Sequence, residues 1–243
     1  MLVDPYLSDS LTTKYAGTDK PHVRMTARII EPERLDFIDY VTSSHNHTDH
    51  LDAETLVPVL RVNPVATLLI PEANRSFVAE RLGSDVAERL VGLNDEPVKA
   101  VALEGFVVTA VPAAHNTIER DGAGNSRFLG YVIRVGTWTV YHAGDTVMFP
   151  GMADHLKPFK VDVALLPING DRPERKVAGN LDGGEAAGLA KAIGARLVIP
   201  MHYDMFEFNT STPDAFVAAC RALGQPHRVL RCGECWSSRE LPV

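Results

Sequence analysis

The chain has 243 residues, of which 45% are hydrophobic and 23% charged, an ordinary globular composition that excludes a chain disordered throughout. Its 24 basic and 31 acidic residues leave a formal charge of −7, the opposite balance from proteins that bind long nucleic acids by neutralising phosphates. Three cysteines are too few for a disulfide framework, and neither a signal peptide nor an apolar run of bilayer length is present. We therefore expect a single cytoplasmic domain over residues 1–243, without a membrane or long nucleic-acid partner.

Short apolar runs alternate with helix-like stretches in the first half of the chain. Leu2-Val3-Asp4 resembles the end of a strand with nothing before it, so we expect a sheet whose first strand is apparently missing at the N-terminus. Asp52 occupies the position of a helix N-cap. The elements predicted here are a strand over Phe37–Thr42, a helix over Ala53–Arg61, a strand over Ala66–Ile70 and a largely helical stretch over Asn74–Leu93, broken around Gly83.

The second half is predicted to be richer in strands. The runs Tyr131–Val135 and Trp138–Tyr141 flank a two-residue turn that contains glycine, which favours a hairpin. Val161–Ile168 is almost entirely apolar, as expected of a strand that is covered on both faces. Further strands are predicted over Phe106–Val111, Arg196–Pro200, Arg228–Arg231 and Trp236–Arg239, and helices over Leu181–Ile193 and Pro213–Leu223. Antiparallel and crossover connections together indicate sheets with helices packed outside them.

Three histidines and a carboxylate lie close together in the loop after the predicted strand Phe37–Thr42. The segment reads Ser44-His45-Asn46-His47-Thr48-Asp49-His50-Leu51-Asp52, and imidazole and carboxylate are suitable ligands for zinc and its first-row neighbours. On an extended backbone His45 and His47 point to the same side and can reach one ion, whereas Asp49 and His50 can be aimed at a second. Burying these groups without partners costs about 1–3 kcal/mol each, a cost that a bound cation removes.

Three further candidate ligands follow strands elsewhere in the chain, at the rim where α/β folds tend to place their sites. A lone histidine is more often a surface or core residue than a ligand, so the clustered motif carries the interpretation. One ion is expected to be held by His45, His47 and His115. The other is expected to be held by Asp49, His50 and His202, with Asp145 bridging the two.

In this order the residues resemble the H-x-H-x-D-H motif, with a distant His, Asp and His, of the metallo-β-lactamase superfamily. All seven positions match between His45 and His202. The resemblance implies an α/β (α+β) fold, an αββα sandwich of two mixed β-sheets with helices on the outer faces and a dinuclear site at one edge. Asp4 resembles the early aspartate of the family, which supports the metal loop from behind.

Shorter segments resemble particular branches of the superfamily. Ser44–Asp52, Asn169-Gly170-Asp171 and Pro200–Asp204 are similar to the L-ascorbate-6-phosphate lactonase group, and Gly179–Asp182 is similar to a broader set of metal-dependent hydrolases. Di-iron members carry a carboxylate at the position of His47. The imidazole found there implies two divalent ions, Zn²⁺ or Mn²⁺, and not redox iron.

These residues indicate a metal-dependent hydrolase in which a metal-bridging hydroxide attacks a carbonyl or phosphoryl centre. Asp49 is expected to hold a metal and to orient or deprotonate the nucleophile. The expected substrate is a small lactone or ester, such as the lactone of a sugar acid or its phosphate. A phosphodiesterase acting on a nucleotide or lipid head group, and a metal-bound non-catalytic binding subunit, remain alternatives. Self-association into a homo-oligomer is a further expectation.

Weaker signals surround the predicted ligands. Asn169, directly after an apolar strand, and Arg172, in the charged loop that follows it, are the predicted substrate contacts. Tyr203 and Asp204 come directly after His202 and are predicted to support it from behind. The polar loop 116–127 is either a lid that shapes specificity or a hairpin tip with no role.

Overall fold

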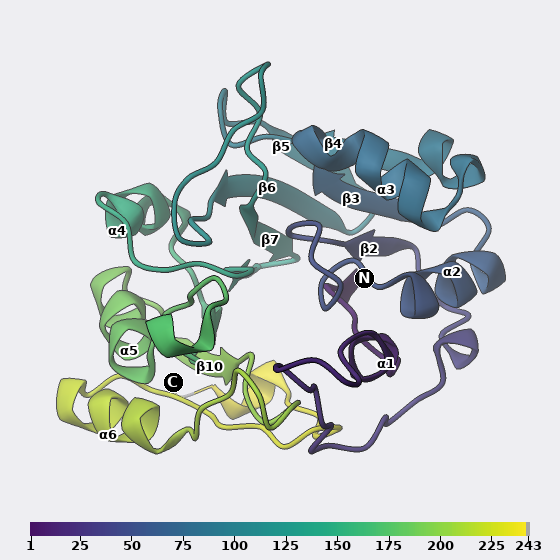
Figure 1. Ribbon diagram of the computed structural model, residues 1–243. Helices are drawn as coiled ribbons and strands as arrows, with labels where there is room; N and C mark the ends of the chain where they lie inside the picture. Colours follow the sequence, from purple (N-terminus) through teal and green to yellow (C-terminus); the bar gives the residue numbers. More distant parts are fainter. Residues whose placement is uncertain (242–243) are drawn as a thin grey trace.

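The computed structural model describes residues 1–241 and consists of two β-sheets packed against each other between outer helices (Figure 1). The smaller sheet is parallel throughout, in the order β1-β2-β3-β4. The larger sheet has the order β10-β9-β8-β7-β6-β5 and mixes parallel with antiparallel pairs. The predicted αββα sandwich is confirmed.

The strands of the smaller sheet are β1 (Leu2–Val3), β2 (Tyr40–Thr42), β3 (Thr67–Pro71) and β4 (Leu90–Leu93). Those of the larger sheet are β5 (Ala100–Leu103), β6 (Phe106–Pro112), β7 (Leu129–Val135), β8 (Trp138–His142), β9 (Val163–Pro167) and β10 (Leu197–Met201). The α-helices are α1 (Ser10–Lys14), α2 (Ala53–Val62), α3 (Arg75–Leu82), α4 (Met152–Leu156), α5 (Gly183–Ala192) and α6 (Asp214–Leu223).

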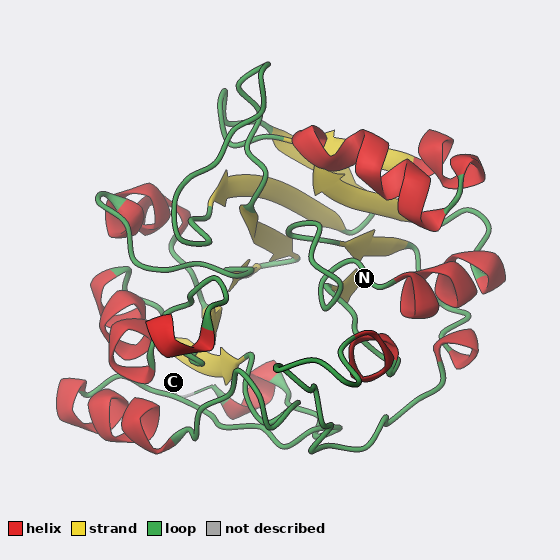
Figure 2. Ribbon diagram, in the orientation of Figure 1, coloured by secondary structure: helices red, strands yellow, loops and turns green. Residues whose placement is uncertain are grey.

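Three of the apolar clusters lie between these layers. Between the sheets, Leu69 and Leu93 pack against Val108 and Tyr131. Helices α2 and α3 cover the outer face of the smaller sheet, and α4, α5 and α6 cover that of the larger one (Figure 2). Burial of apolar surface stabilises such layers by about 25 cal/mol per Å². Among the described residues, no helix combines the length and the apolar character that crossing a membrane requires.

Most predicted elements are present, with ends shifted by a few residues. The hairpin forms as predicted, with Val135 opposite Trp138. The Asp182 carboxylate caps α5 by accepting a hydrogen bond from the amide of Glu185, while the Glu185 side chain accepts one from the amide of Asp182.

The secondary structure differs from the prediction in three segments. The stretch Asn74–Leu93 is helical as far as Arg89, with the expected break at Gly83 (φ 107°), but Leu90–Leu93 pairs with β3 as a parallel strand. Neither Arg228–Arg231 nor Trp236–Arg239 forms a strand. The chain meets β10 in a single bridge, Val198 with His227, and the Glu234 side chain then closes a turn by accepting from the amide of Arg231.

Candidate metal centre

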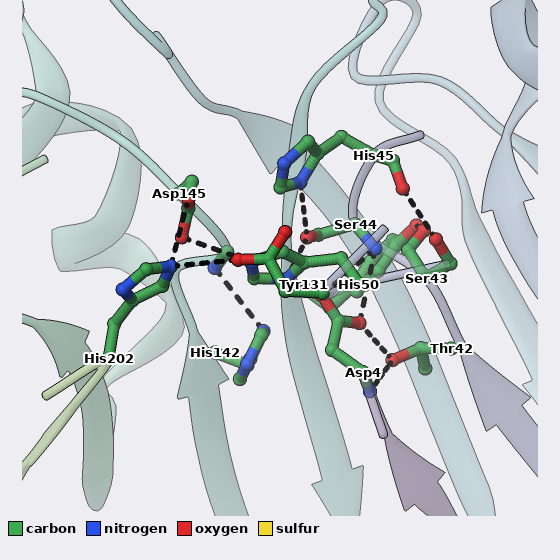
Figure 3. A network of polar contacts seen from close by, with 12 residues as sticks. Asp4, Thr42, Ser43, Ser44, His45, His50, Tyr131, His142, Asp145 and His202 are labelled. Carbon is green, nitrogen blue, oxygen red and sulfur yellow. Dashed lines mark hydrogen bonds and ion pairs between the residues drawn. The ribbon is translucent and has the colours of Figure 1, made fainter. Parts of the chain in front are cut away.

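The predicted ligands all lie past the C-terminal ends of strands, where the two sheets meet. The loop 43–51 follows β2, and His115, Asp145 and His202 follow β6, β8 and β10. Parallel alignment of β1 with β2, and of β8 with β9 and β10, brings these strand ends to one edge of the sandwich. Side chains separated by up to 157 positions therefore face one another (Figure 3).

One group of ligand atoms comes from His45, His47 and His115, and these atoms lie within 4.8 Å of one another. His45 and His115 are buried, and His47 is exposed. The Nδ1 atom of His115 lies 3.0 Å from the carbonyl oxygen of Gly179, so it carries the proton and leaves the Nε2 lone pair free. Three imidazoles converge here in the form that binds a metal.

A second group comes from Asp49, His50, Asp145 and His202, whose ligand atoms also lie within 4.8 Å of one another. The Nε2 atom of His202 is 3.3 Å from both Asp49 Oδ2 and Asp145 Oδ2, and the Nε2 atom of His50 is 3.2 Å from Asp145 Oδ1. His202 has a left-handed backbone, with φ 60°, a strained conformation that clusters at functional sites.

Asp145 lies between the two groups. Its Oδ2 atom is 3.3 Å from His202 Nε2 in the second group and 3.7 Å from His115 Nε2 in the first. The side chain is 4% exposed, so the surrounding protein holds it in this position.

The protonation of the two groups differs. Burial, together with the neighbouring imidazoles, lowers the pKa of His45 and His47. Burial also opposes the charged form of His202, but the carboxylates of Asp145 and Asp49 outweigh it and raise the pKa of His202 to about 10. The imidazoles of His50 and His202 outweigh the burial of Asp49 and Asp145 and hold the pKa of both carboxyls well below the usual range. His45 and His47 are therefore neutral, and the second group is a buried cluster of opposite charges.

A metal ion would satisfy buried atoms that lack a hydrogen-bond partner. Among the described residues, the Nε2 atom of His45 is buried without any such partner, and those of His50 and His202 contact only carboxylates of the same cluster, at 3.2 and 3.3 Å. Such an atom costs about 1–3 kcal/mol. Imidazole nitrogens and carboxylate oxygens bind Zn²⁺ at about 2.0–2.2 Å and also suit related divalent cations. The donor set therefore fits one metal ion in each group.

A layer of hydrogen bonds fixes the metal loop from behind (Figure 3). The carboxylate of Asp4 accepts from the Thr42 hydroxyl at 2.8 Å and from the Ser44 amide at 3.1 Å, and it contacts His50 Nδ1 at 2.8 Å. The Tyr131 hydroxyl donates to the carbonyl oxygen of Ser43 at 2.8 Å. Asp4 thus lies where the sequence predicted it, behind the second group.

The predicted substrate contacts lie elsewhere. The Asn169 side chain is buried and donates to Asn209 Oδ1 while accepting from the Asn180 amide. Arg172 is exposed and lies outside the pocket described below. Asn169 follows a strand at this edge, as predicted, but its side chain is buried in hydrogen bonds with Asn180 and Asn209 and does not line the pocket.

Tyr203 and Asp204, the two residues after His202, form hydrogen bonds with other parts of the protein. The Tyr203 hydroxyl donates to the carbonyl oxygen of Leu230 at 3.1 Å. The Asp204 amide donates to Thr210 Oγ1 at 2.8 Å, and its backbone is left-handed at φ 57°. Both residues hold the loop after β10, which positions His202.

A pocket of about 540 Å³ opens above the two groups and exposes a ligand from each of the contributing loops. Its floor includes His47, Asp49, His115, Asp145 and His202. The wall includes residues to which the sequence analysis gave no role: Lys14, Tyr15, Lys20, His22, Phe77 and Arg81. These residues show no recognisable spacing in the sequence, and only the folded chain brings them to the pocket.

Comparison with known proteins finds relatives among the metal-dependent hydrolases of the beta-lactamase superfamily. A family model described as the beta-lactamase superfamily domain matches residues 1–203 and so includes all seven candidate ligands. A UPF0173 metal-dependent hydrolase of Methanosphaerula palustris is 34% identical over 188 residues, which are 74% of this chain and 75% of that protein. One of Rubrobacter xylanophilus is 31% identical over 230 residues, 92% of this chain and 82% of that protein.

A solved structure shares the fold. Igni18, a metallo hydrolase from Ignicoccus hospitalis, superimposes with a TM-score of 0.64 at 24% sequence identity and covers 81% of this chain and 77% of its own.

Proposed function

This chain belongs to the UPF0173 family of metal-dependent hydrolases within the beta-lactamase superfamily, and we propose that it uses two divalent ions, Zn²⁺ or Mn²⁺, to hydrolyse a small lactone or ester. The pocket of about 540 Å³ supports a small molecule as the substrate. The three cysteines are free thiols, which supports a reducing, cytoplasmic compartment.

The observation that carries this proposal is the connection of two ligand groups through Asp145, whose carboxylate approaches histidines of both. His45, His47 and His115 would hold one ion, and Asp49, His50 and His202 would hold the other, with Asp145 within reach of both. The chemistry that two bound ions would supply here is a lowered pKa of water, and so hydroxide near neutral pH.

The protein residues hold the reacting groups and move the proton. Asp49 lines the pocket with 27% of its side chain exposed, whereas Asp145 beside it is 4% exposed. The more accessible carboxylate of Asp49 can therefore orient the attacking water and accept a proton. The outer hydrogen bonds of Asp4 and of His115 Nδ1 keep the ligand rings oriented, so little reorganisation is needed.

The lactone or ester is supported by the resemblance of the metal loop to the lactonase group and by the imidazole at position 47, which suits Zn²⁺ or Mn²⁺. Phosphodiesters contain an electrophilic centre that the same chemistry would attack, so they belong in the test. A subunit that binds metal without catalysis is the third outcome.

The test starts from protein stripped with a chelator and reloaded with Zn²⁺ or Mn²⁺. Elemental analysis should find two equivalents of metal, and a panel of lactones, esters and phosphodiesters should include one that the loaded protein hydrolyses. His47→Ala and Asp145→Asn should lower its turnover about hundredfold or more. His155→Ala, at an exposed position on α4, is the matched control.

Each alternative has its own result. Turnover of phosphodiesters alone would replace the lactone or ester as the substrate. A protein with both metals that hydrolyses none of the panel would favour the non-catalytic subunit. Wild-type rates in His47→Ala would exclude the two-metal mechanism.

A further inference from the structure

The N-terminal segment forms one wall of the pocket and carries two lysines to it. Helix α1 lies between α2 and the loop after β10 (Figure 1), and Lys14 is its last residue. The Lys14 ammonium is 3.5 Å from the hydroxyl of Thr48, the residue between His47 and Asp49. Lys14 is thus held directly beside the metal loop.

Lys20 reaches the pocket from the same segment. Its ammonium donates to the carbonyl oxygen of Lys176 at 2.8 Å, and the next residues of that loop, Val177 and Ala178, also line the pocket. The two ammonium groups therefore contact different walls, one formed by the metal loop after β2 and one by the loop after β9.

Specific contacts fix this segment, so the lysines are not on a free tail. The Ser10 hydroxyl donates to Asp52 Oδ1 at 2.8 Å and joins α1 to the start of α2. The Thr12 hydroxyl donates to the carbonyl oxygen of His22 at 2.7 Å and closes the loop that contains both lysines. Further along, the Met25 amide donates to the carbonyl oxygen of Met205 at 2.8 Å. The pocket wall is anchored at both ends.

The charge of these lysines is not balanced locally. Their ammonium groups contact a hydroxyl and a carbonyl oxygen, and neither forms an ion pair with a carboxylate of the described residues 1–241. The carboxylates lining the pocket are Asp49 and Asp145, which belong to the metal centre. Together with Asp4 and the proposed hydroxide they balance the four charges of two divalent cations, so the charges of Lys14 and Lys20 are in excess. A protein with a net charge of −7 thus presents a positive pocket.

A positive pocket of this kind recognises anions. An ammonium group donates up to three hydrogen bonds, and hydrogen bonds between charged partners are about twice as strong as neutral ones. Lysine also carries a long, flexible stem, so its ammonium can turn from a neutral oxygen to an anionic one.

Resting on the function proposed above, we propose that Lys14 and Lys20 bind an anionic oxygen group of the substrate, a carboxylate or a phosphate, while its lactone or ester carbonyl lies over the metal centre. The two lysines are then specificity-determining residues, and the predicted role of Arg172 passes to them. The enzyme selects acids or phosphates that carry a hydrolysable carbonyl elsewhere in the molecule.

The test uses the metal-loaded full chain and two matched pairs of substrates. Glucono-δ-lactone is compared with its 6-phosphate, and dimethyl succinate with monomethyl succinate, so that each pair keeps the scissile bond and differs in charge. We expect a higher kcat/KM for the anionic member of at least one pair, and the pair identifies phosphate or carboxylate. In the double variant Lys14→Gln/Lys20→Gln that value should fall about tenfold, with less than about a twofold change for the neutral member.

Two controls separate recognition from structure. Lys14→Arg should retain most of the preference, because it keeps the charge. Lys191→Gln removes an exposed lysine on α5 and should leave both pairs unchanged. Higher ionic strength should weaken the preference of the wild-type protein and leave neutral substrates unaffected.

The outcomes distinguish this inference from the proposed function. Equal rates for neutral and anionic members, or a preference that survives in the double variant, overturns the role of the lysines even if hydrolysis is confirmed. If none of the four compounds is hydrolysed, calorimetric titration with succinate and with inorganic phosphate decides. Binding about tenfold weaker in the double variant supports the lysines alone, and unchanged or undetectable binding of both probes overturns the inference.

Discussion

The Oδ2 atom of Asp4 lies 2.8 Å from the Nδ1 atom of His50, although 46 positions separate the two residues. Burial opposes the ionised carboxyl, but the imidazoles of His142 and His50 outweigh it and hold the pKa of Asp4 below its usual range. An ionised Asp4 keeps the proton of His50 on Nδ1 and leaves Nε2 facing the metal centre.

Asp4→Asn should therefore weaken metal binding without unfolding the protein. An amide loses the charge that holds His50 in this form, and changes of this kind typically cost about 10–100-fold in metal affinity. Competition with a coloured chelator measures the effect, and Asp36→Asn, at an exposed position near the same sheet, is the control. Equal affinity in both variants would show that Asp4 does not position His50.

Removing the metal should lower the stability of the folded protein. Without it, the buried Nε2 atom of His45 has no hydrogen-bond partner, and a ligand that binds only the folded state stabilises it by mass action. We expect a chelator to lower the melting temperature by about 5 °C or more, since 1 kcal/mol corresponds to about 2–4 °C at this size. His202→Asn should reduce the shift and His155→Ala should not. A melting temperature unaffected by the chelator would contradict a structural contribution of the metal.

Gly144→Ala should destabilise the protein because two loops meet at this residue. A Cβ atom here would lie 2.8 Å from Ser44 Cβ and 2.9 Å from the carbonyl oxygen of Leu129, and the backbone is left-handed at φ 61°. We expect a loss of about 1–3 kcal/mol in the free energy of unfolding and a displaced Asp145. Urea denaturation measures it.

Gly188→Ala is the matched control, and we expect it to change the free energy of unfolding in the opposite direction. Gly188 lies inside α5 with open space around its missing Cβ, so alanine should stabilise the protein by about 0.5–1 kcal/mol. Similar effects of the two substitutions would contradict the close approach at Gly144.

Two buried tyrosines offer a paired test of the hydrogen bond behind the metal loop. The Tyr131 hydroxyl donates to the carbonyl oxygen of Ser43, whereas that of Tyr141 is buried with no partner in the described part of the chain. Tyr131→Phe should cost about 0.5–1.5 kcal/mol of unfolding free energy, and Tyr141→Phe should be neutral or stabilising. Equal losses of unfolding free energy in the two variants would mean that the hydrogen bond from Tyr131 to Ser43 does not stabilise the protein.

Local pattern accounts for the elements that the sequence predicted well. The Val161–Ile168 run and the hairpin around Gly136 depend on apolar periodicity and turn chemistry. The Leu90–Leu93 strand was missed because four residues after a helical stretch carry no periodicity of their own, and only pairing with β3 makes them a strand. Trp236–Arg239 was predicted as a strand, but no strand within residues 1–241 pairs with it.

The superfamily and the seven candidate ligands were readable from the sequence, since ligand chemistry restricts residue type and four of the seven are packed into the loop His45–His50. The division of the ligand atoms into two groups agrees with the expected one, because strand ends on one edge bring distant side chains together. Tertiary structure alone decided what surrounds that centre: it buried Asn169, left Arg172 outside, and brought Lys14 and Lys20 to the pocket. Ligand types are set by the metal and recur in recognisable spacing, whereas a pocket wall needs only position and charge, which any segment of the folded chain can supply.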